Sequence, residues 1–175
     1  MTRAVSLLLL DRDGTVNVKA PEGEYVTGPS ELELLPGAAE AIARANGAGV
    51  PVALLTNQRG VALGRMSERD FEAVHAELVA QLAGEGARVD AIFACMHERG
   101  TCSCRKPDPG LLLSALDRFG IAPSEAVMIG DADSDVEAGR RAGVRTMRID
   151  PAAGRSPDEA VAPTLRDAVA TVLGA

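Results

Sequence analysis

The sequence has almost no aromatic residues: phenylalanine, tyrosine and tryptophan together make up 2% of its 175 residues, and tryptophan is absent. Apolar residues nevertheless reach 46%, so the core must be built from leucine, valine, alanine and isoleucine on short helices and strands. This composition suits an α/β protein. A chain of this length has room for one domain with a substantial core and is too short for two ordinary ones. We therefore expect residues 1–175 to form a single domain.

Positive charge is also in deficit, because 18 basic side chains stand against 25 acidic ones and the net charge is -7. Most of such a surface repels a polyanion, and the scarcity of aromatic side chains removes the platforms on which bases stack. We expect no nucleic-acid partner. An anionic substrate would need a local basic pocket.

Long hydrophobic runs are missing as well, since no segment approaches the roughly 20 apolar residues that cross a bilayer. The opening apolar run, residues 4–10, leads directly into charged residues and is typical of a strand, not of a signal peptide. The sequence predicts a cytoplasmic protein with no membrane partner, and we expect it to be a monomer.

Apolar runs alternate with helical patterns along the chain. The expected strands are residues 4–10, 50–55, 91–94, 126–129 and 144–149. The expected helices are residues 37–48, 67–82, 108–119, 134–142 and 164–173, with N-caps at Ser67 (in a capping box with Asp70), at Asp108 before Pro109, at Asp133 or Ser134, and at Thr164. Residues 16–30 should form an irregular flap and residues 151–163 a linker. This alternation predicts a Rossmann-like, doubly wound parallel sheet without a large cap domain.

The most informative motif is Asp11-Arg12-Asp13-Gly14-Thr15, directly after the first apolar run. A buried strand that ends in two carboxylates projects both acids into one crevice. Asp11 can attack phosphorus as a nucleophile, while Asp13 can give a proton to the leaving oxygen and later take one from water. Taken alone, the motif is also compatible with a strand that runs into a polar turn.

Two further polar clusters follow expected strands, at Thr56-Asn57 and at Asp131 to Asp135. The carboxyl ends of parallel strands share one edge of the sheet, so we expect the clusters to converge on Asp11 and Asp13. Asp11, the main-chain carbonyl of Asp13, and Asp131 are suitable ligands for Mg²⁺. The hydroxyl of Thr56 and the amide of Asn57 can donate hydrogen bonds to phosphoryl oxygens.

Lys106 can neutralise the charge that develops on those oxygens, and we expect Asp135 to brace the site. Thr56 and Asn57 alone are equally compatible with a strand-end turn. The acidic stretch is no EF-hand loop, because Val136 and Ala142 stand where that loop needs glycine and glutamate.

The second strong motif is Cys95-x-His97 followed by Cys102-x-Cys104. Three thiolates and one imidazole at this spacing predict a closed, structural Zn²⁺ site in a loop over residues 95–104. The alternative is a set of buried, unligated cysteines, and a redox role is disfavoured by the Cys-x-Cys spacing. Because Arg105 and Lys106 come directly after Cys104, we expect the zinc to fix the backbone that presents both cations.

Taken together, DRDGT, TNQ, RKP and GDADSD occur in the order of the four motifs of the haloacid dehalogenase superfamily, which this chain resembles. The joint presence of DRDGT, TNQRG and the cysteine and histidine loop leading into CRKPDPG resembles one branch of it. That branch contains the zinc-containing D-glycero-D-manno-heptose-1,7-bisphosphate 7-phosphatases and the related histidinol-phosphate phosphatases. The similarity runs from about residue 8 to residue 148.

The resemblance implies a role for each matching position. Asp11 would be the nucleophile, Asp13 the acid and base, Thr56 and Lys106 the stabilisers of the phosphoryl group, and Asp11, Asp13 and Asp131 the holders of Mg²⁺. Substrate contacts would come from the side chains that flank these motifs, namely Arg12, Lys19, Tyr25, Asn57, Gln58, Arg59 and Arg105.

The sequence therefore predicts a Mg²⁺-dependent phosphomonoesterase that forms an aspartyl-phosphate and acts on a small phosphorylated sugar, foremost a heptose bisphosphate. Histidinol phosphate and other small sugar phosphates are the alternative substrates. An inactive, zinc-stabilised binding protein is the alternative from another class. Asp13 disfavours a dehalogenase, and the acidic surface disfavours a DNA 3′-phosphatase.

Overall fold

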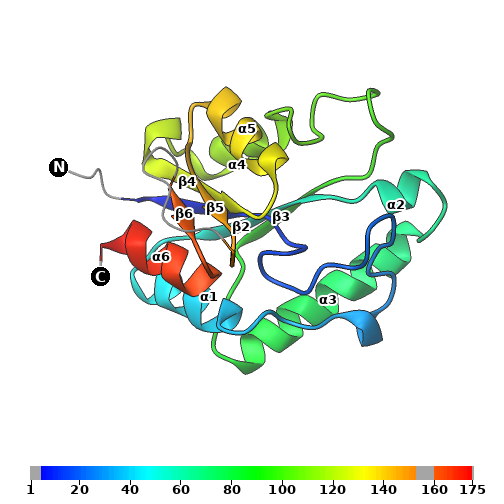
Figure 1. Cartoon of the computed structure of the whole chain (residues 1–175), viewed down its shortest axis with the longest axis horizontal. Helices are drawn as coiled ribbons and strands as arrows, with labels where there is room; N and C mark the ends of the chain where they lie inside the picture. The colour runs from blue at the N-terminus through cyan, green and yellow to red at the C-terminus, as the bar shows by residue number, and fades with distance from the viewer. Residues whose placement is uncertain (1–4, 153–159, 175) are drawn as a thin grey trace.

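The computed structural model describes residues 5–152 and 160–174, which form a six-stranded sheet between two layers of helices (Figure 1). All strand pairs are parallel, in the order β3-β2-β1-β4-β5-β6. The strands are β1 (Leu7–Leu10), β2 (Val52–Asn57), β3 (Ala91–Cys95), β4 (Ala126–Gly130), β5 (Arg145–Ile149) and β6 (Val161–Ala162). The predicted doubly wound α/β fold is confirmed.

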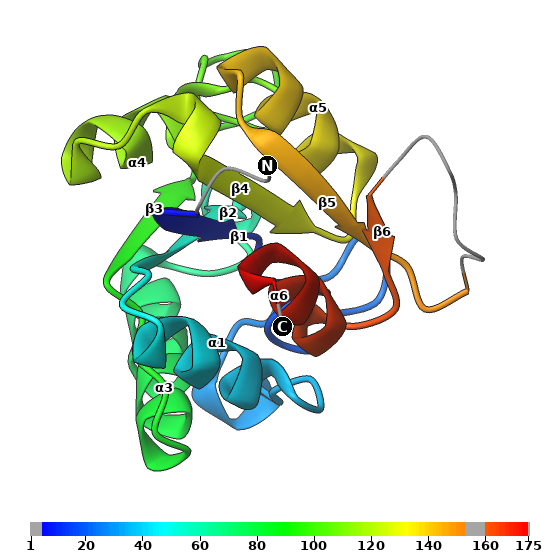
Figure 2. The same cartoon turned by 90° about the vertical axis from the view of Figure 1, so that its left-hand side faces the viewer.

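Helices cover both faces of this sheet (Figure 2). The α-helices are α1 (Ala38–Gly47), α2 (Arg59–Ala62), α3 (Glu68–Gly84), α4 (Gly110–Phe119), α5 (Asp133–Ala142) and α6 (Leu165–Leu173), and two short 3-10 turns are η1 (Pro29–Glu31) and η2 (Pro123–Glu125). Helices α1, α3 and α6 lie on one face, α4 and α5 on the other.

Strand β1 shows why the chain folds into three layers. Leu8 and Leu10 pack with α1, α3 and α6, whereas Leu7 and Leu9 pack with α4 and α5, and all four are fully buried. Successive side chains of a strand point to opposite faces, so an uninterrupted apolar run requires a cover on both. The core is almost entirely aliphatic, as the composition indicated.

Besides the two 3-10 turns, one strand and one α-helix were not expected from the sequence. The stretch 151–163, predicted as a linker, contains β6, which is held to β5 by backbone bonds from Arg148 N to Ala160 O (2.8 Å) and from Asp150 N to Ala162 O (3.0 Å). Residues 153–159 of that stretch, and the residue at position 4 expected to begin β1, lie outside the described part of the chain. The short helix α2 is the other addition, and it borders the functional site.

The predicted helix starts were partly wrong. The Ser67 and Asp70 capping box and the Thr164 cap are confirmed, with Ser67 and Thr164 each accepting a bond from the backbone three residues on. Helix α4, however, begins at Gly110, and the carboxylate of Asp108 instead pairs with Arg141 at 3.1 Å. Helix α5 begins at Asp133, after Ala132, so neither Asp133 nor Ser134 is the N-cap.

Among the described residues, no helix combines the length and apolar character needed to cross a membrane. The flap (residues 16–30), α2 and the loop that carries the cysteines and His97 (residues 95–104, the zinc loop) gather at the same end of the molecule, on the right of Figure 1. The carboxyl ends of β1, β2 and β4, where their polar residues lie, are at this same end.

Candidate active site

Lys106 lies at the centre of the site and is hydrogen-bonded on three sides. Its Nζ donates to Asp11 Oδ1 at 2.7 Å, to Asp135 Oδ1 at 2.6 Å and to the carbonyl of Leu55 at 2.7 Å. Asp11 follows β1, Leu55 is in β2 and Asp135 is in the first turn of α5. The prediction that these strand ends converge is therefore confirmed, and Asp135 braces the site as expected.

Burial shapes the charges of this cluster. Lys106 is 3% exposed and Asp11 9% exposed. Burial alone disfavours the charged lysine, but Asp11 and Asp135 outweigh it, and the pKa of Lys106 is raised. Burial raises the pKa of Asp11 to about 8, although Lys106 opposes the shift. The neighbouring carboxylates of Asp135 and Asp13 add to the effect of burial on Asp11.

Asp131 completes a group of carboxylates suited to a divalent cation. Ligand oxygens of Asp11, Asp131 and Asp135 all lie within 4.8 Å of one another. Asp131 Oδ2 accepts from Lys19 Nζ at 3.1 Å, whereas its Oδ1 is buried and has no hydrogen-bond partner among the described residues. Oxygen donors and an unpartnered buried acceptor fit a hard cation such as Mg²⁺.

Asp13 is held by a separate set of side chains. Its Oδ1 accepts from Arg12 Nη2 at 2.8 Å and from Asn17 Nδ2 at 3.0 Å, and its Oδ2 accepts from Gln58 Nε2 at 2.9 Å. Burial opposes ionisation, but the guanidinium of Arg12 and the bonds from Asn17 and Gln58 hold the pKa of Asp13 below its ordinary value. The carboxylate keeps 23% exposure toward solvent.

Two residues expected to contact substrate lie beneath this carboxylate. Arg12 is fully buried and Gln58 is 1% exposed. Their side chains hold Asp13. For fully buried Arg12 this role replaces the predicted substrate contact, whereas Gln58 also lines the cleft, and its contact with substrate stays a prediction. Asn17, also fully buried, is a further support that the sequence reasoning missed. It lies in the stretch predicted as an irregular flap, and no motif marks it.

Asn57 also bonds to another residue of the site. Its Nδ2 donates to the carbonyl of Lys106 at 3.0 Å and its Oδ1 accepts from the Lys106 N–H at 3.1 Å. The side-chain amide thus holds the backbone of the lysine, and its predicted contact with a phosphoryl group stays a prediction. Thr56 Oγ1 accepts from Gln58 Nε2 at 2.7 Å, and the donation of its own proton to a phosphoryl oxygen stays a prediction.

The predicted zinc ligands come together in the loop after β3. Cys95 Sγ lies 3.5 Å from Cys102 Sγ and 3.6 Å from His97 Nδ1, and His97 Nδ1 lies 3.2 Å from Cys104 Sγ. Bonds of about 2.3 Å to sulfur and 2.0 Å to nitrogen give ligand separations of about 3.5–3.8 Å in a tetrahedron. The four side chains therefore fit a closed Zn²⁺ site.

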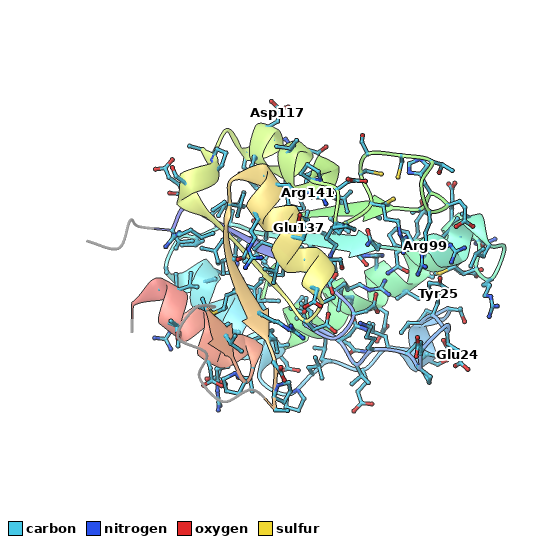
Figure 3. All side chains as sticks on the ribbon, turned by 45° about the horizontal axis from the view of Figure 1, so that its top comes forward. Glu24, Tyr25, Arg99, Asp117, Glu137 and Arg141 are labelled. Atoms are coloured by element: carbon cyan, nitrogen blue, oxygen red, sulfur yellow. The ribbon has the colours of Figure 1, made fainter. Side chains whose placement is uncertain are left out.

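The flap and the zinc loop face each other across a cleft of about 690 Å³, into which Asp13, Lys19, Tyr25 and Arg59 open. Figure 3 shows Glu24 and Tyr25 on the flap near Arg99 of the zinc loop. Arg59 lines the cleft as expected, but its Nε is engaged by Glu98.

Arg105 borders a neighbouring pocket of about 410 Å³, together with Arg99 and Lys106. Its Nη1 is buried without a hydrogen-bond partner among the described residues. Because the net charge of the chain is negative, an anionic substrate would need a local basic pocket, and this pocket provides one beside the carboxylates.

The chain is similar to several known proteins. The D-glycero-β-D-manno-heptose-1,7-bisphosphate 7-phosphatase of Mesorhizobium japonicum is 39% identical over 169 residues, which cover 91% of this chain and 76% of that protein. The corresponding α-heptose enzyme of Mycobacterium tuberculosis is 40% identical over 132 residues, 74% of this chain and 69% of that protein.

A crystal structure of D,D-heptose 1,7-bisphosphate phosphatase from B. bronchiseptica, complexed with magnesium and phosphate, superposes with a TM-score of 0.88. It has 32% identity and covers 97% of this chain and 99% of its own. A family model described as haloacid dehalogenase-like hydrolase matches residues 3–143. On this extent of similarity and on its site geometry, the chain belongs to the haloacid dehalogenase-like hydrolase family.

Proposed function

We propose that this protein is a phosphatase that removes the 7-phosphate of a D-glycero-D-manno-heptose 1,7-bisphosphate through a phosphorylated Asp11. The contact of Lys106 with both Asp11 and Asp135, beside Asp131, carries this proposal. This contact brings together a buried carboxylate that can act as a nucleophile, the ammonium group of Lys106 and a cluster of carboxylates that could hold a metal ion. Phosphoryl transfer depends mainly on such positioning and charge.

In the first step, a carboxylate oxygen of Asp11 forms a bond to phosphorus as the bond to the sugar oxygen breaks. Asp11 Oδ1 is held by Lys106, which leaves Oδ2 for the attack. Because the pKa of Asp13 is held below its ordinary value in the substrate-free protein, Asp13 must take up a proton when the substrate binds, and it gives that proton to the departing sugar oxygen. The Thr56 hydroxyl and the Lys106 ammonium bind the phosphoryl oxygens, where negative charge accumulates.

In the second step, Asp13 takes a proton from a water molecule, whose oxygen then attacks phosphorus. The bond to Asp11 breaks, inorganic phosphate leaves, and both carboxylates return to their starting state. Arg12, Asn17 and Gln58 keep Asp13 in one orientation for both proton transfers. The exposed fraction of Asp13 faces the cleft through which sugar and water arrive.

Two metals fit the side chains present. Asp11 and Asp131 would hold Mg²⁺, with the main-chain carbonyl of Asp13 as a further ligand. When bound, Mg²⁺ supplies positive charge that favours ionised Asp11 and offsets its repulsion of the phosphate. Cys95, His97, Cys102 and Cys104 would hold Zn²⁺, which orders the loop that carries Arg105 and Lys106.

A bisphosphate suits the distribution of positive charge. Beyond Lys106, the cleft and the adjoining pocket are bordered by Lys19, Arg59, Arg99 and Arg105. We propose that Arg105, with its unpartnered buried nitrogen, contributes to recognition of the second phosphate. Relatives of almost equal identity are named for the α and for the β heptose, so either anomer is a candidate substrate.

Phosphate release from a substrate panel tests the proposal. The panel contains both heptose 1,7-bisphosphate anomers, histidinol phosphate and p-nitrophenyl phosphate, each with Mg²⁺ and with EDTA. We expect the highest kcat/KM for a heptose bisphosphate and no turnover in EDTA. A preference for histidinol phosphate would overturn the substrate assignment.

The variant Asp11→Asn tests the nucleophile, because an amide cannot form the acyl phosphate. We expect kcat to fall by about 10⁴-fold or more. Asp117→Asn is the matched control, since Asp117 is an exposed carboxylate on α4 outside the lining of the cleft. Retained turnover in Asp11→Asn would refute the mechanism.

A further inference from the structure

The first two residues of α2 connect the two walls of the cleft. Arg59 donates through Nε to Glu98 of the zinc loop. Gly60, the next residue, lies directly beneath the aromatic ring of Tyr25 in the flap. Helix α2 thus touches the zinc loop with one residue and the flap with the following one.

The contact at Gly60 depends on the absence of a side chain. A Cβ placed on Gly60 would lie 2.9 Å from Cγ, 3.0 Å from Cδ2 and 3.1 Å from Cδ1 of Tyr25. Gly60 is not among the residues with positive φ, so its backbone conformation is open to any residue. What excludes a larger residue is the position of the ring.

The flap has a separate anchor in the core. Val26 is 4% exposed and packs in the cluster that contains α1, α3 and α6. Tyr25 points instead toward the cleft that it lines with Lys19, and it is half-buried against Gly60. The ring is therefore not needed to attach the flap to the domain, but it decides how the flap lies over the cleft.

We propose that Gly60 is a positioning residue whose bare backbone seats Tyr25, and that this seat fixes the flap over the substrate. With the ring seated, Tyr25 and Lys19 form one wall of the cleft, opposite the zinc loop. Substitution of Gly60 displaces the ring and opens that wall. The part of the inference that concerns substrate rests on the proposed function, whereas the seat itself is testable without substrate.

The composition of the chain provides a specific probe. Tyr25 is the only tyrosine and there is no tryptophan, so emission excited at the tyrosine band comes from the flap alone. We would measure acrylamide quenching and fluorescence anisotropy on the full-length, zinc-loaded protein. In Gly60→Ala we expect stronger quenching and lower anisotropy than in the wild type, because the ring is pushed into solvent.

Gly47→Ala is the matched control. Gly47 is an exposed glycine at the end of α1, where an added methyl meets no described atom within 4 Å. This variant should reproduce the quenching and anisotropy of the wild type. If Gly60→Ala is folded by circular dichroism and quenched no more than Gly47→Ala, the seat does not exist.

Tyr25→Ala tests the same contact from the other side and does not depend on the stability of Gly60→Ala. Hydrogen exchange of backbone amides in residues 16–30 should be faster in Tyr25→Ala than in the wild type, and near the wild-type rate in Tyr25→Phe, which keeps the ring. Equal exchange in Tyr25→Ala and the wild type overturns the proposal, even if the protein has no phosphatase activity.

Kinetics on the heptose bisphosphate separate positioning from general destabilisation. We expect KM to rise about fivefold in Gly60→Ala and in Tyr25→Ala, the size typical of one lost aromatic contact, with kcat nearly unchanged. The double variant should show no larger rise than either single one, because both remove the same contact. Additive effects would show that the two residues act independently and would overturn the proposal.

Discussion

Asn57 holds the backbone of Lys106 from both sides, with its amide nitrogen on the carbonyl (3.0 Å) and its amide oxygen on the N–H (3.1 Å). Asn46 makes the same pair of bonds to the backbone of Arg88, at 3.0 and 2.8 Å, far from the carboxylates. The two asparagines can therefore be compared, because one holds the backbone of the lysine that we propose binds the phosphoryl group, and the other only joins two segments.

Replacing Asn57 by alanine should lower kcat about 10- to 100-fold, because Lys106 Nζ loses its fixed approach to Asp11. Asn46→Ala should lose a comparable amount of stability, about 1–3 kcal/mol for two hydrogen bonds, without a change in kcat. Steady-state kinetics and thermal unfolding of both variants make the comparison. Equal kcat in the two variants would show that the Asn57 contact has no catalytic role.

Gln58 tests whether a buried amide acts on the substrate or on Asp13. Its Nε2 bonds to both Thr56 and Asp13. In Gln58→Ala we expect kcat to fall about tenfold or more with KM within a factor of about two, since a lost orientation affects the chemical step. Gln81→Ala is the control, as Gln81 is a partly buried amide in α3. A raised KM with normal kcat in Gln58→Ala would instead restore the direct substrate contact that the sequence predicts.

Zinc should be required for the position of Lys106 and not for Mg²⁺ binding. In Cys102→Ser we expect less bound zinc by elemental analysis, a lower melting temperature and a lower kcat, with an unchanged Mg²⁺ dependence. Ser103→Ala is the control, because Ser103 is an exposed neighbour between two of the predicted ligands. A folded Cys102→Ser variant that lacks zinc and keeps full activity would contradict the link between the two metal sites.

His75 should make the fold less stable in acid. It is 7% exposed in α3, its Nδ1 lies 3.1 Å from the carbonyl of Phe71, and its Nε2 has no partner among the described residues. Burial lowers its pKa from 6.5 to about 4, and the nearby charge of Arg12 acts in the same direction.

The pH dependence of the free energy of unfolding follows from the protonation of His75 in the folded and unfolded chains. The unfolded chain binds a proton at His75 near pH 6.5, whereas the folded protein does so only near pH 4. The free energy of unfolding therefore falls as the pH drops through this interval, by at most about 1.4 kcal/mol per pH unit. Asp11 also has a shifted pKa and contributes to the pH dependence of stability. Measuring the free energy of unfolding by chemical denaturation at several pH values for the wild type and for His75→Gln, both in Mg²⁺, separates the contribution of His75 from that of Asp11. The same pH dependence in both proteins would exclude it.

The central strands were predictable because they carry long apolar runs with a polar residue at the end. Leu7–Leu10 followed by Asp11 is the clearest case. Strand β6 (Val161–Ala162) was not predictable, because it is only two residues long and lies in a stretch of proline and alanine. Its extended conformation is stabilised by pairing with β5 and not by its local sequence. Helix α2 is equally hard to predict, because it is only four residues long and begins without a capping side chain.

At the site, the sequence identified which residues lie close together, but not which of them contact other site residues. Spacing placed Asp11, Lys106, Asp131 and the zinc ligands correctly, because strand ends and ligand motifs impose their positions. It assigned Arg12 to the substrate, whereas this side chain is fully buried and bonds to Asp13. Gln58 and Asn57 line the cleft as expected but also bond to Asp13 and to the backbone of Lys106, which no motif indicates. Whether a polar side chain faces the cleft or its neighbour depends on tertiary packing.

The place of β1 in the sheet has a consequence for biosynthesis. This strand leaves the ribosome more than a hundred residues before one of its two neighbours, β4, with Leu7 opposite Ala126 and Leu10 opposite Ile129. Until that late segment emerges, the nascent chain carries a fully apolar strand with an unpaired edge, the kind of surface that self-associates. Growing chains of this protein should therefore depend on chaperone protection, and truncations that end before β4 should aggregate.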